Sequence, residues 1–240
     1  MTTETADLAA SKIGTITILP PQDVLDTLAS IQETVTTTIL DPWYNKGVGG
    51  VREGYREWLN QVVAQSSRIS EHVFVWGFPE IVYTVLESTT PQFSLIAWLT
   101  WYYKNCPSVI RGWRSAQLAC LHLGRNGAKL YSEHFLNEAQ YERKKQGKLR
   151  YMPGPPSVIE VPLNIGFVGK AEQTGHPAQK PVKAFEPLIL MTTQENDLVL
   201  DPMCGAGTTG VVCQQLNRRA ILCDQSAEWI EVTKHRLAFK

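Results

Sequence analysis

The sequence predicts an α/β fold in which helices cover both faces of a mostly parallel sheet. Apolar runs that suit buried strands alternate with segments whose apolar residues recur at helical spacing. A glycine-rich turn at Gly205–Gly210 joins one such strand to a helix. The 240 residues are 43% hydrophobic and 19% charged, which suits one large folded domain and is too little charge for a disordered chain.

Several classes of protein are excluded by composition. No apolar run reaches the roughly 18 residues of a membrane span, so a membrane protein is excluded. The start, Met1–Ser11, has neither a basic n-region nor an apolar h-region, so we expect no secretory signal and a cytoplasmic location. The five cysteines show no C-x-x-C spacing, so neither a disulfide scaffold nor a structural zinc site is expected, and no metal is predicted. We interpret residues 1–240 as a single domain with a loose segment at 1–12.

The elements of the first half follow from periodicity and from glycine and proline breaks. An apolar run at 13–19 ends at two prolines, and a β-branched run at 36–40 predicts a strand that runs into Asp41. Residues 45–54 contain four glycines and no periodicity, so a mobile loop is expected there. Further strands are predicted at 72–78, 93–101 and 118–123, and helices at 22–30, 55–65 and 81–86.

The second half begins with a departure from this alternation. Residues 137–157 are polar, then basic, then rich in proline and glycine, which predicts a long excursion from the core. Leu198–Leu200 predicts a buried strand that meets Asp201, and the glycine turn follows it. The other strands are expected at 158–162 and 220–223, and the helices at 182–192, 208–216 and 227–238.

Charge is balanced overall but unevenly distributed. Lys plus Arg and Asp plus Glu both number 23, yet the stretch from Arg111 to Arg150 has nine basic and three acidic residues, a local charge of +6. This stretch is either a solvated helix face or a surface that contacts phosphates. A zero total does not exclude nucleic acid, because salt screens distant charges beyond roughly 8–10 Å. The candidate DNA-binding residues are Arg111, Arg114, Arg143, Lys144, Lys145 and Lys148.

The glycine turn allows three interpretations. Gly205–Gly210 satisfies G-x-G-x-x-G, and Asp224 follows 14 residues later, so a dinucleotide site must be considered. A pyrophosphate prefers bare N–H groups at a helix N-terminus, and Asp201 would place a carboxylate beside it. The sulfonium and ammonium groups of S-adenosylmethionine suit that acid better, and Asp224 can bind a ribose in either case. The third interpretation is a tight strand-to-helix connection without a ligand.

The turn Asp41-Pro42-Trp43-Tyr44 is either a strand-ending turn with two core aromatics or a binding site for a base amine. The lone pair of such an amine is delocalised into its ring, so the nitrogen is a poor nucleophile. The Asp41 carboxylate and the Pro42 carbonyl can accept its two hydrogens, and Tyr44 offers a face on which an extruded base can stack.

Three blocks of sequence, taken in order, resemble a known family. Asp41–Tyr44 is similar to a catalytic D/S-P-P-Y/F motif, His176–Pro181 to an H-P-x-x-K-P segment, and Asp201–Thr209 to a D-P-F-x-G-x-G-T-T donor-binding motif. Together they resemble the β-class N6-adenine/N4-cytosine DNA methyltransferases, over roughly 36–126 and 158–240. The resemblance implies the Rossmann-like fold of S-adenosylmethionine-dependent methyltransferases with a circularly permuted motif order.

The resemblance also assigns roles. Asp41, Pro42 and Tyr44 would be catalytic, Lys180 could reach the methionine carboxylate of the donor, and 127–157 would be a target-recognition insertion. The partner would be double-stranded DNA with the target base flipped, and a homodimer is possible. The residues that would bind S-adenosylmethionine are His176, Gln179, Lys180, Pro181, Asp201, Cys204, Gly205, Gly207 and Asp224. Three residues depart from the family pattern: Trp43 replaces a proline, Met203 a phenylalanine, and Asp224 a glutamate.

The function predicted from these motifs is site-specific transfer of a methyl group to an exocyclic amine of a DNA base by direct displacement. Within the resembled family, Asp at the first position of the catalytic motif favours adenine and Ser favours cytosine, so the resemblance favours N6 of adenine over N4 of cytosine. Trp43 motivates one alternative, a non-catalytic nucleic-acid-binding subunit. An RNA amino-methyltransferase and an NAD-dependent oxidoreductase that uses the glycine turn are the others.

Overall fold

The computed structural model describes residues 10–45, 50–106 and 112–238. The candidate residue Arg111, residues 46–49 of the expected mobile loop and residues 1–9 of the expected loose start lie outside these ranges. The strands are β1 (Ser11–Ile13), β2 (Ile16–Ile18), β3 (Val35–Leu40), β4 (Ser70–Gly77), β5 (Phe93–Tyr102), β6 (Gln117–Arg125), β7 (Val158–Glu160), β8 (Leu198–Asp201) and β9 (Arg219–Leu222). The helices are α1 (Val24–Ser30), α2 (Tyr55–Ile69), α3 (Pro79–Val82), α4 (Glu138–Lys145), α5 (Val182–Thr192), α6 (Thr208–Gln215) and α7 (Ala227–Ala238).

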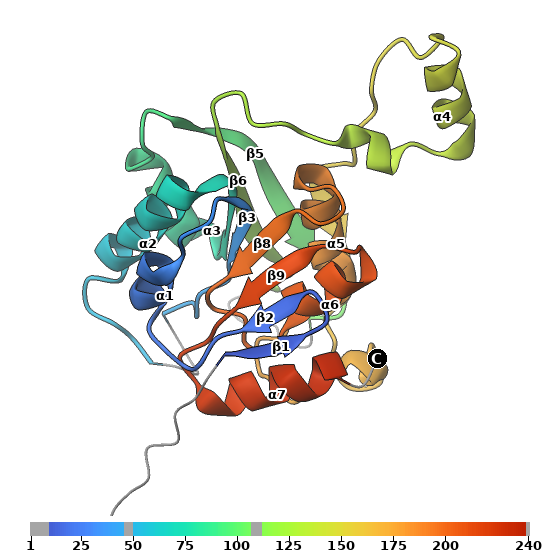
Figure 1. Ribbon diagram of the computed structural model, residues 1–240. Coiled ribbons are helices and arrows are strands. Elements are labelled where there is room, and N and C mark those ends of the chain that lie inside the picture. The colour runs from blue at the N-terminus through green and yellow to red at the C-terminus, as the bar shows by residue number, and fades with distance from the viewer. Residues whose placement is uncertain (1–9, 46–49, 107–111, 239–240) are drawn as a thin grey trace, which may run out of the picture.

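Within the described ranges the strands form one sheet in the order β1-β2-β9-β8-β3-β4-β6-β5-β7 (Figure 1). The pairs β2–β9, β9–β8, β8–β3, β3–β4 and β5–β7 are parallel, and the pairs that involve β1 or β6 are antiparallel. The mostly parallel sheet is therefore confirmed. Strand β3 precedes β8 by far in the sequence and lies beside it in the sheet, which is the permuted order that the motifs predicted.

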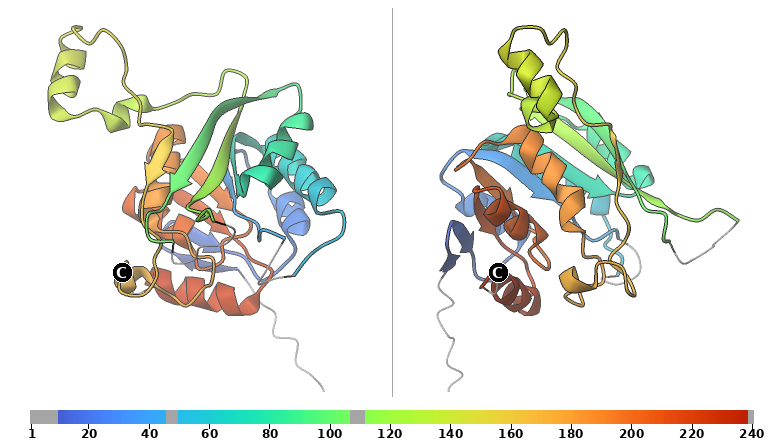
Figure 2. Two further views of the ribbon diagram at one scale, coloured as in Figure 1. Left: turned by 180° about the vertical axis from the view of Figure 1, so that it is seen from behind. Right: turned by 90° about the vertical axis from the view of Figure 1, so that its right-hand side faces the viewer.

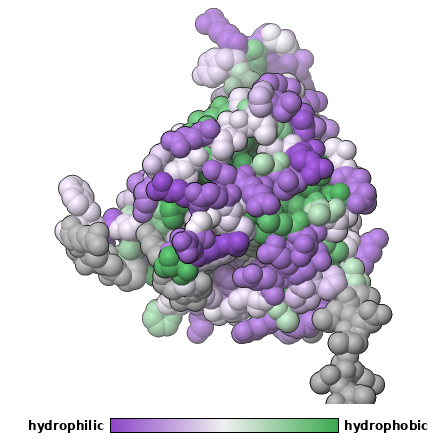
Figure 3. All heavy atoms as spheres, turned by 90° about the vertical axis from the view of Figure 1, so that its left-hand side faces the viewer, coloured by the Kyte–Doolittle hydropathy of each residue, from purple (hydrophilic) through white to green (hydrophobic). Residues whose placement is uncertain are grey.

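Helices cover both faces of this sheet, as the sequence predicted. Helices α1, α2 and α3 lie on one face and α5, α6 and α7 on the other (Figures 1 and 2). Each face of the sheet has its own hydrophobic core, and adjacent residues of one strand point to opposite faces. Ile39 belongs to the same core as Phe74, and Leu40 belongs with Val75 to the other. The surface over α1–α3 is largely hydrophilic (Figure 3). No helix in the described ranges has both the length and the apolar character needed to cross a membrane.

Some elements differ from the sequence prediction. Part of the segment expected to be loose forms β1, which pairs with β2 as a hairpin at the sheet edge; three-residue strands are too short to show alternation. The helix expected at 81–86 is the short helix α3 followed by a 3-10 helix at Tyr83–Glu87. The excursion contains helix α4, which begins at a capping box where Asn137 and Gln140 bond reciprocally at 2.9 Å.

The excursion leaves the sheet at the end opposite to the one where β3 terminates. Strand β6 runs antiparallel to β4, so its end at Gly124 lies beside His72, near the start of β4. The backbone N–H of Tyr131 then donates to Met191 O at 2.8 Å, which fastens the excursion to the last turn of α5. Helix α4 stands clear of the body at this end, and segment 161–175 lies at the other end (Figures 1 and 2).

Candidate active site

The site forms where two parallel strands end side by side. Thr38 of β3 pairs with Leu200 of β8, so the carboxyl ends of both strands reach the same edge of the sheet. Asp41 follows β3 directly and Asp201 is the last residue of β8. Both residues line one cavity of about 810 Å³. Crevices at the carboxyl ends of such strands are the usual ligand sites of open α/β sheets.

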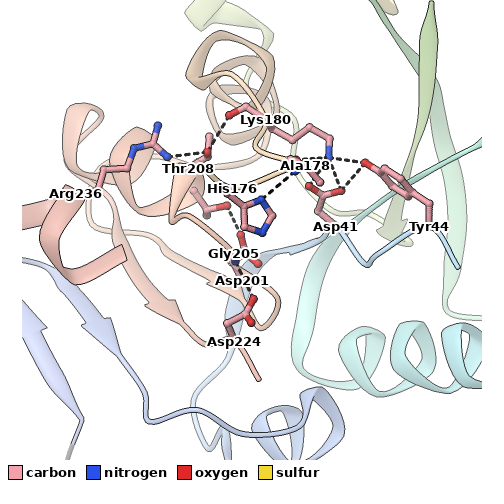
Figure 4. Close-up of polar contacts among 11 residues, drawn as sticks. Asp41, Tyr44, His176, Ala178, Lys180, Asp201, Gly205, Thr208, Asp224 and Arg236 are labelled. Carbon is pink, nitrogen blue, oxygen red and sulfur yellow. Dashed lines mark hydrogen bonds and ion pairs between the residues drawn. The ribbon is translucent and has the colours of Figure 1, made fainter. Parts of the chain in front are cut away.

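A buried ion pair organises the turn Asp41–Tyr44, which was predicted to be catalytic (Figure 4). The Lys180 ammonium donates to the two carboxylate oxygens of Asp41 at 2.8 and 2.6 Å and also to the Tyr44 hydroxyl. That hydroxyl donates in turn to Asp41 at 3.1 Å. The Lys180 side chain is 3% exposed and that of Asp41 is 16% exposed, so the lysine is the more deeply buried partner. The ammonium predicted to reach a donor carboxylate is here bound to the carboxylate of Asp41, which was predicted to be catalytic.

Trp43 is partly buried: it lines the cavity and also packs against the core under the turn. Its ring packs against Tyr55 and Trp58 of α2, with ring centroids 5.4 and 4.9 Å apart. The Tyr55 hydroxyl donates to the Trp43 carbonyl at 2.6 Å. This anchoring to α2 holds the turn in place where the family pattern has a second proline.

The glycine turn lies very close to its neighbouring side chains. Gly205 and Gly207 have φ of +48° and +73°, a region that favours glycine. A Cβ on Gly205 would lie 3.0 Å from His176 Nε2, and one on Gly207 would lie 2.7 Å from the Thr233 side chain. Side chains at either position would therefore fill the space between the turn and its neighbours.

Two carboxylates hold the turn from opposite sides. Asp224 accepts from the backbone N–H groups of Gly205 and Ser226, both at 2.9 Å. Asp201 accepts from Met203 N at 3.1 Å and from the Thr209 hydroxyl. Burial raises the pKa of Asp201 to about 7, and these two hydrogen bonds offset the effect only in part.

The H-P-x-x-K-P segment forms the opposite wall of the cavity. The His176 ring lies edge-on to Trp229 with centroids 4.4 Å apart, and burial lowers the pKa of His176, which favours the neutral imidazole. Gln179 is occupied with its own loop, because it accepts from Thr174 and donates to the Glu172 carbonyl at 2.6 Å. Gln179 therefore contributes to the cavity wall by holding the backbone at Glu172 and Thr174 in place.

Most of the predicted site residues share the cavity. Pro181 and Gly207 lie behind its wall, where they begin α5 and α6. The residues that line it are Asp41, Pro42, Tyr44, His176, Gln179, Lys180, Asp201, Cys204, Gly205 and Asp224.

The predicted DNA-binding residues are divided between the two ends of the sheet. Arg114 is exposed on the β5–β6 connection, at the cavity edge. Arg143, Lys144, Lys145 and Lys148 lie in or just after α4, at the far edge, and the structure does not bring them to the cavity. A target-recognition segment over the cavity of the same molecule would therefore have to come from elsewhere than α4.

Sequence reasoning missed residues that touch the predicted ones. Trp229, which supports His176, lies in the helix that follows Asp224 and was hidden among other apolar positions of that helix. Thr209 donates to Asp201, and the Thr-Thr pair of the motif was a usable signal, since a hydroxyl in the first turn of a helix can reach the preceding strand end. Arg52 also lines the cavity, but nothing in its loop distinguishes it in the sequence.

Comparison with known proteins agrees with this geometry. The model of the N6/N4 DNA methylase family, described as "DNA methylase", matches residues 53–235, a range that begins after the turn Asp41–Tyr44. The type II methyltransferase M.HpaI of Haemophilus parainfluenzae is 27% identical over 230 residues, which are 90% of this chain and 72% of that protein. The DNA adenine methyltransferase YhdJ of Escherichia coli K12 is 25% identical over 238 residues, 88% of this chain and 80% of that protein.

The fold has a solved counterpart. The crystal structure of the M1.HpyAVI–SAM complex superposes with a TM-score of 0.72 at 20% identity, over 92% of this chain and 98% of that one. The likeness confirms the Rossmann-like methyltransferase fold, and the family match covers more than half of the sequence. The chain therefore belongs to the N6/N4 DNA methylase family, the S-adenosylmethionine-dependent enzymes that methylate an exocyclic amine of a DNA base.

Proposed function

We propose that this chain methylates N6 of adenine, in preference to N4 of cytosine, in a base flipped out of double-stranded DNA. The observation that carries the proposal is the shared cavity of Asp41 and Asp201, which puts an acceptor for amine hydrogens beside the glycine turn. The name of YhdJ, a DNA adenine methyltransferase, supports adenine, as does the aspartate that opens the catalytic motif. An 810 Å³ cavity at the sheet edge suits a base that has left the stack.

Asp41, Pro42 and Tyr44 are the residues that receive the base. The Asp41 carboxylate and the Pro42 carbonyl accept the amine hydrogens and orient the nitrogen lone pair toward the glycine turn. Asp41 Oδ1 already accepts from both Lys180 and Tyr44, but Oδ2 accepts from Lys180 and has a second lone pair, so the amine can bind at Oδ2 while the lysine stays. The base stacks on Tyr44, whose ring is held edge-on to Phe78 at 5.0 Å. The proton released after transfer leaves through Asp41 to water.

The donor side is built from the glycine turn and its two acids. S-adenosylmethionine supplies an electrophilic methyl group on a cationic sulfur. Asp201 places a buried carboxylate where the positive charges of the donor suit it, and Asp224 lies at the end of β9, where a ribose can be bound. Gly205 leaves the space beside His176 open. The residues present therefore fit this donor.

The experiment that tests the proposal is incubation of the protein with unmethylated DNA and labelled donor, followed by nucleoside mass spectrometry. We expect N6-methyladenine. N4-methylcytosine would move the assignment to the other amine. Donor binding without any methylated nucleoside would favour a non-catalytic subunit, and calorimetric heat with NAD but none with the donor would favour an oxidoreductase.

Donor binding is expected to depend on pH through Asp201. Since the pKa of Asp201 is raised to about 7, the free protein holds this group protonated below that pH, and binding a cationic donor requires its ionisation. The apparent affinity should therefore rise with pH by up to about tenfold per unit as pH 7 is approached, and level off above it. Calorimetry in buffers of different ionisation enthalpy measures both the affinity and the released proton.

Asp201→Asn is the matched control for this pH dependence. The variant should bind the donor more weakly and with the rise between about pH 5 and 7 removed. A wild-type affinity that stays flat through this range would show that Asp201 is already ionised in the free protein.

The basic side chains of α4 remain proposed DNA contacts. Replacing Lys144, Lys145 and Lys148 with glutamine should weaken DNA binding and reduce the slope of log affinity against log salt by up to about 3, since each phosphate contact contributes about 0.9. Because α4 lies at the far edge, such contacts require either DNA that extends past the body or the α4 of a second copy, which a homodimer would supply. Light scattering with and without DNA distinguishes the two, and an unchanged slope would leave α4 as a solvated helix.

A further inference from the structure

An exposed phenylalanine stands at the rim of the cavity. Leu163, Asn164, Ile165 and Gly166 line the cavity, and the next residue, Phe167, is 94% exposed. This is the highest exposure among the large apolar side chains of the described ranges. Single exposed apolar residues are common, so the exposure alone decides nothing. The position of this ring, one residue from the cavity wall, is what calls for an explanation.

The turn that presents Phe167 is fastened by hydrogen bonds on both sides. Val168 N donates to Ile165 O at 3.0 Å, and the Gln173 side chain donates to the carbonyls of Gly166 and Val168 at 3.1 and 2.8 Å. The backbone on either side of Phe167 is thereby fixed, although its side chain is almost fully exposed. A fixed backbone holds the ring out at the rim with little freedom to fold back onto the body.

The base of this turn is tied to the rest of the site. Asn105 and Leu163 exchange two hydrogen bonds, at 2.9 and 2.8 Å. Glu172 accepts from the Asn164 side chain and from Val182 N, at the start of α5. Lys180 lies two residues before that helix, so the rim and the catalytic ion pair are parts of one connected wall.

The proposed reaction indicates what an exposed aromatic ring at this rim would contact. Extruding a base from a duplex leaves a gap between its two neighbours, and the lost stacking opposes the extrusion. A flat aromatic ring fills such a gap and stacks on the exposed base faces without regard to sequence. The ring must stand beside the opening that receives the base, on the face that meets the DNA. Phe167 lies one residue from the cavity wall, and its exposed ring is accessible to a duplex that delivers a base to the cavity.

Other exposed aromatic side chains meet them less well. Trp113 is also at this edge, but neither of its neighbours Gly112 and Arg114 lines the cavity. Tyr151 is 76% exposed and belongs to the excursion at the opposite end of the sheet. We propose that Phe167 is a wedge that enters the duplex in place of the flipped base and stabilises the extruded state, a role that rests on the proposed function of the cavity.

The test compares native and heat-denatured samples of the same unmethylated DNA, because a wedge matters only where a stack must be opened. Phe167→Ala should lower methylation of native DNA by about tenfold, the scale of one lost base–aromatic stack, and leave methylation of denatured DNA near wild type. Phe167→Trp should restore the native rate. Tyr83→Ala, which removes an exposed ring of the 3-10 helix at Tyr83–Glu87 that does not line the cavity, should leave the ratio of the two rates unchanged.

Each other outcome overturns the wedge, and the outcomes separate it from the proposed function. If Phe167→Ala lowers the methylation of native and denatured DNA equally, Phe167 is a general DNA contact. If it does not lower the methylation of native DNA, Phe167 has no role in the reaction. If the wild-type protein methylates denatured DNA but not native DNA, the wedge is refuted and the proposed methyltransferase function is retained. If the wild-type protein binds donor and methylates neither sample, the proposed function fails and the wedge fails with it.

Discussion

Asp41→Asn is expected to reduce methyl transfer by about 10²- to 10³-fold, the usual loss when one polar group that stabilises a transition state is removed. Asparagine keeps the size of the side chain but turns one acceptor oxygen into a donor, which cannot bind an amine hydrogen. The glycine turn and its two acids are separate from Asp41 in the sequence and have their own hydrogen bonds. Donor binding should therefore stay close to wild type.

Single-turnover methylation and donor calorimetry on the same preparation measure these two quantities. Asp26→Asn is the matched control, because Asp26 is an exposed acid of α1 that does not line the cavity. It should change neither quantity. Equal losses of transfer and donor binding would place Asp41 in the donor site, and full transfer would remove it from the reaction.

The sequence was sufficient for those parts of the site that local chemistry determines. Asp41 and Asp201 each end an apolar run, and in a parallel sheet such ends meet at one edge, so their common cavity could be anticipated. The positive φ of Gly205 and Gly207 follows from a turn that only glycine tolerates. The catalytic and donor motifs were therefore recognisable even though most of the chain separates them.

The features that the sequence did not predict depend on how segments distant in the chain are oriented relative to one another. Neither the partner of Lys180 nor the direction of the Trp43 ring can be read from spacing, because each is set by a segment distant in the chain. The basic helix was expected near the DNA because charge is visible in a sequence, whereas the edge from which the excursion leaves is fixed by the antiparallel pairing of β6. Phe167 was passed over because exposure is a property of the folded surface.

The pair of Asp41 and Lys180 gives the second large effect, which is on stability. Asp41→Asn leaves the Lys180 ammonium, which is 3% exposed, without its counter-charge, and Lys180→Met leaves the Asp41 carboxylate, which is 16% exposed, without its own. Breaking a buried ion pair in this way costs about 3–5 kcal/mol of unfolding free energy, and the cost should be greater for Asp41→Asn because the lysine is the more deeply buried partner. Urea unfolding of each variant measures it.

The double variant Asp41→Asn/Lys180→Met separates the two roles of the pair. With neither charge present, the unfolding free energy should recover relative to the sum of the single losses, with a coupling energy of about 1–3 kcal/mol. Methyl transfer should not recover, because the acceptor of the amine hydrogens is still missing. Additive stability losses would mean that the pair does not form in the free protein, and recovered transfer would mean that the Asp41 carboxylate serves only to neutralise Lys180.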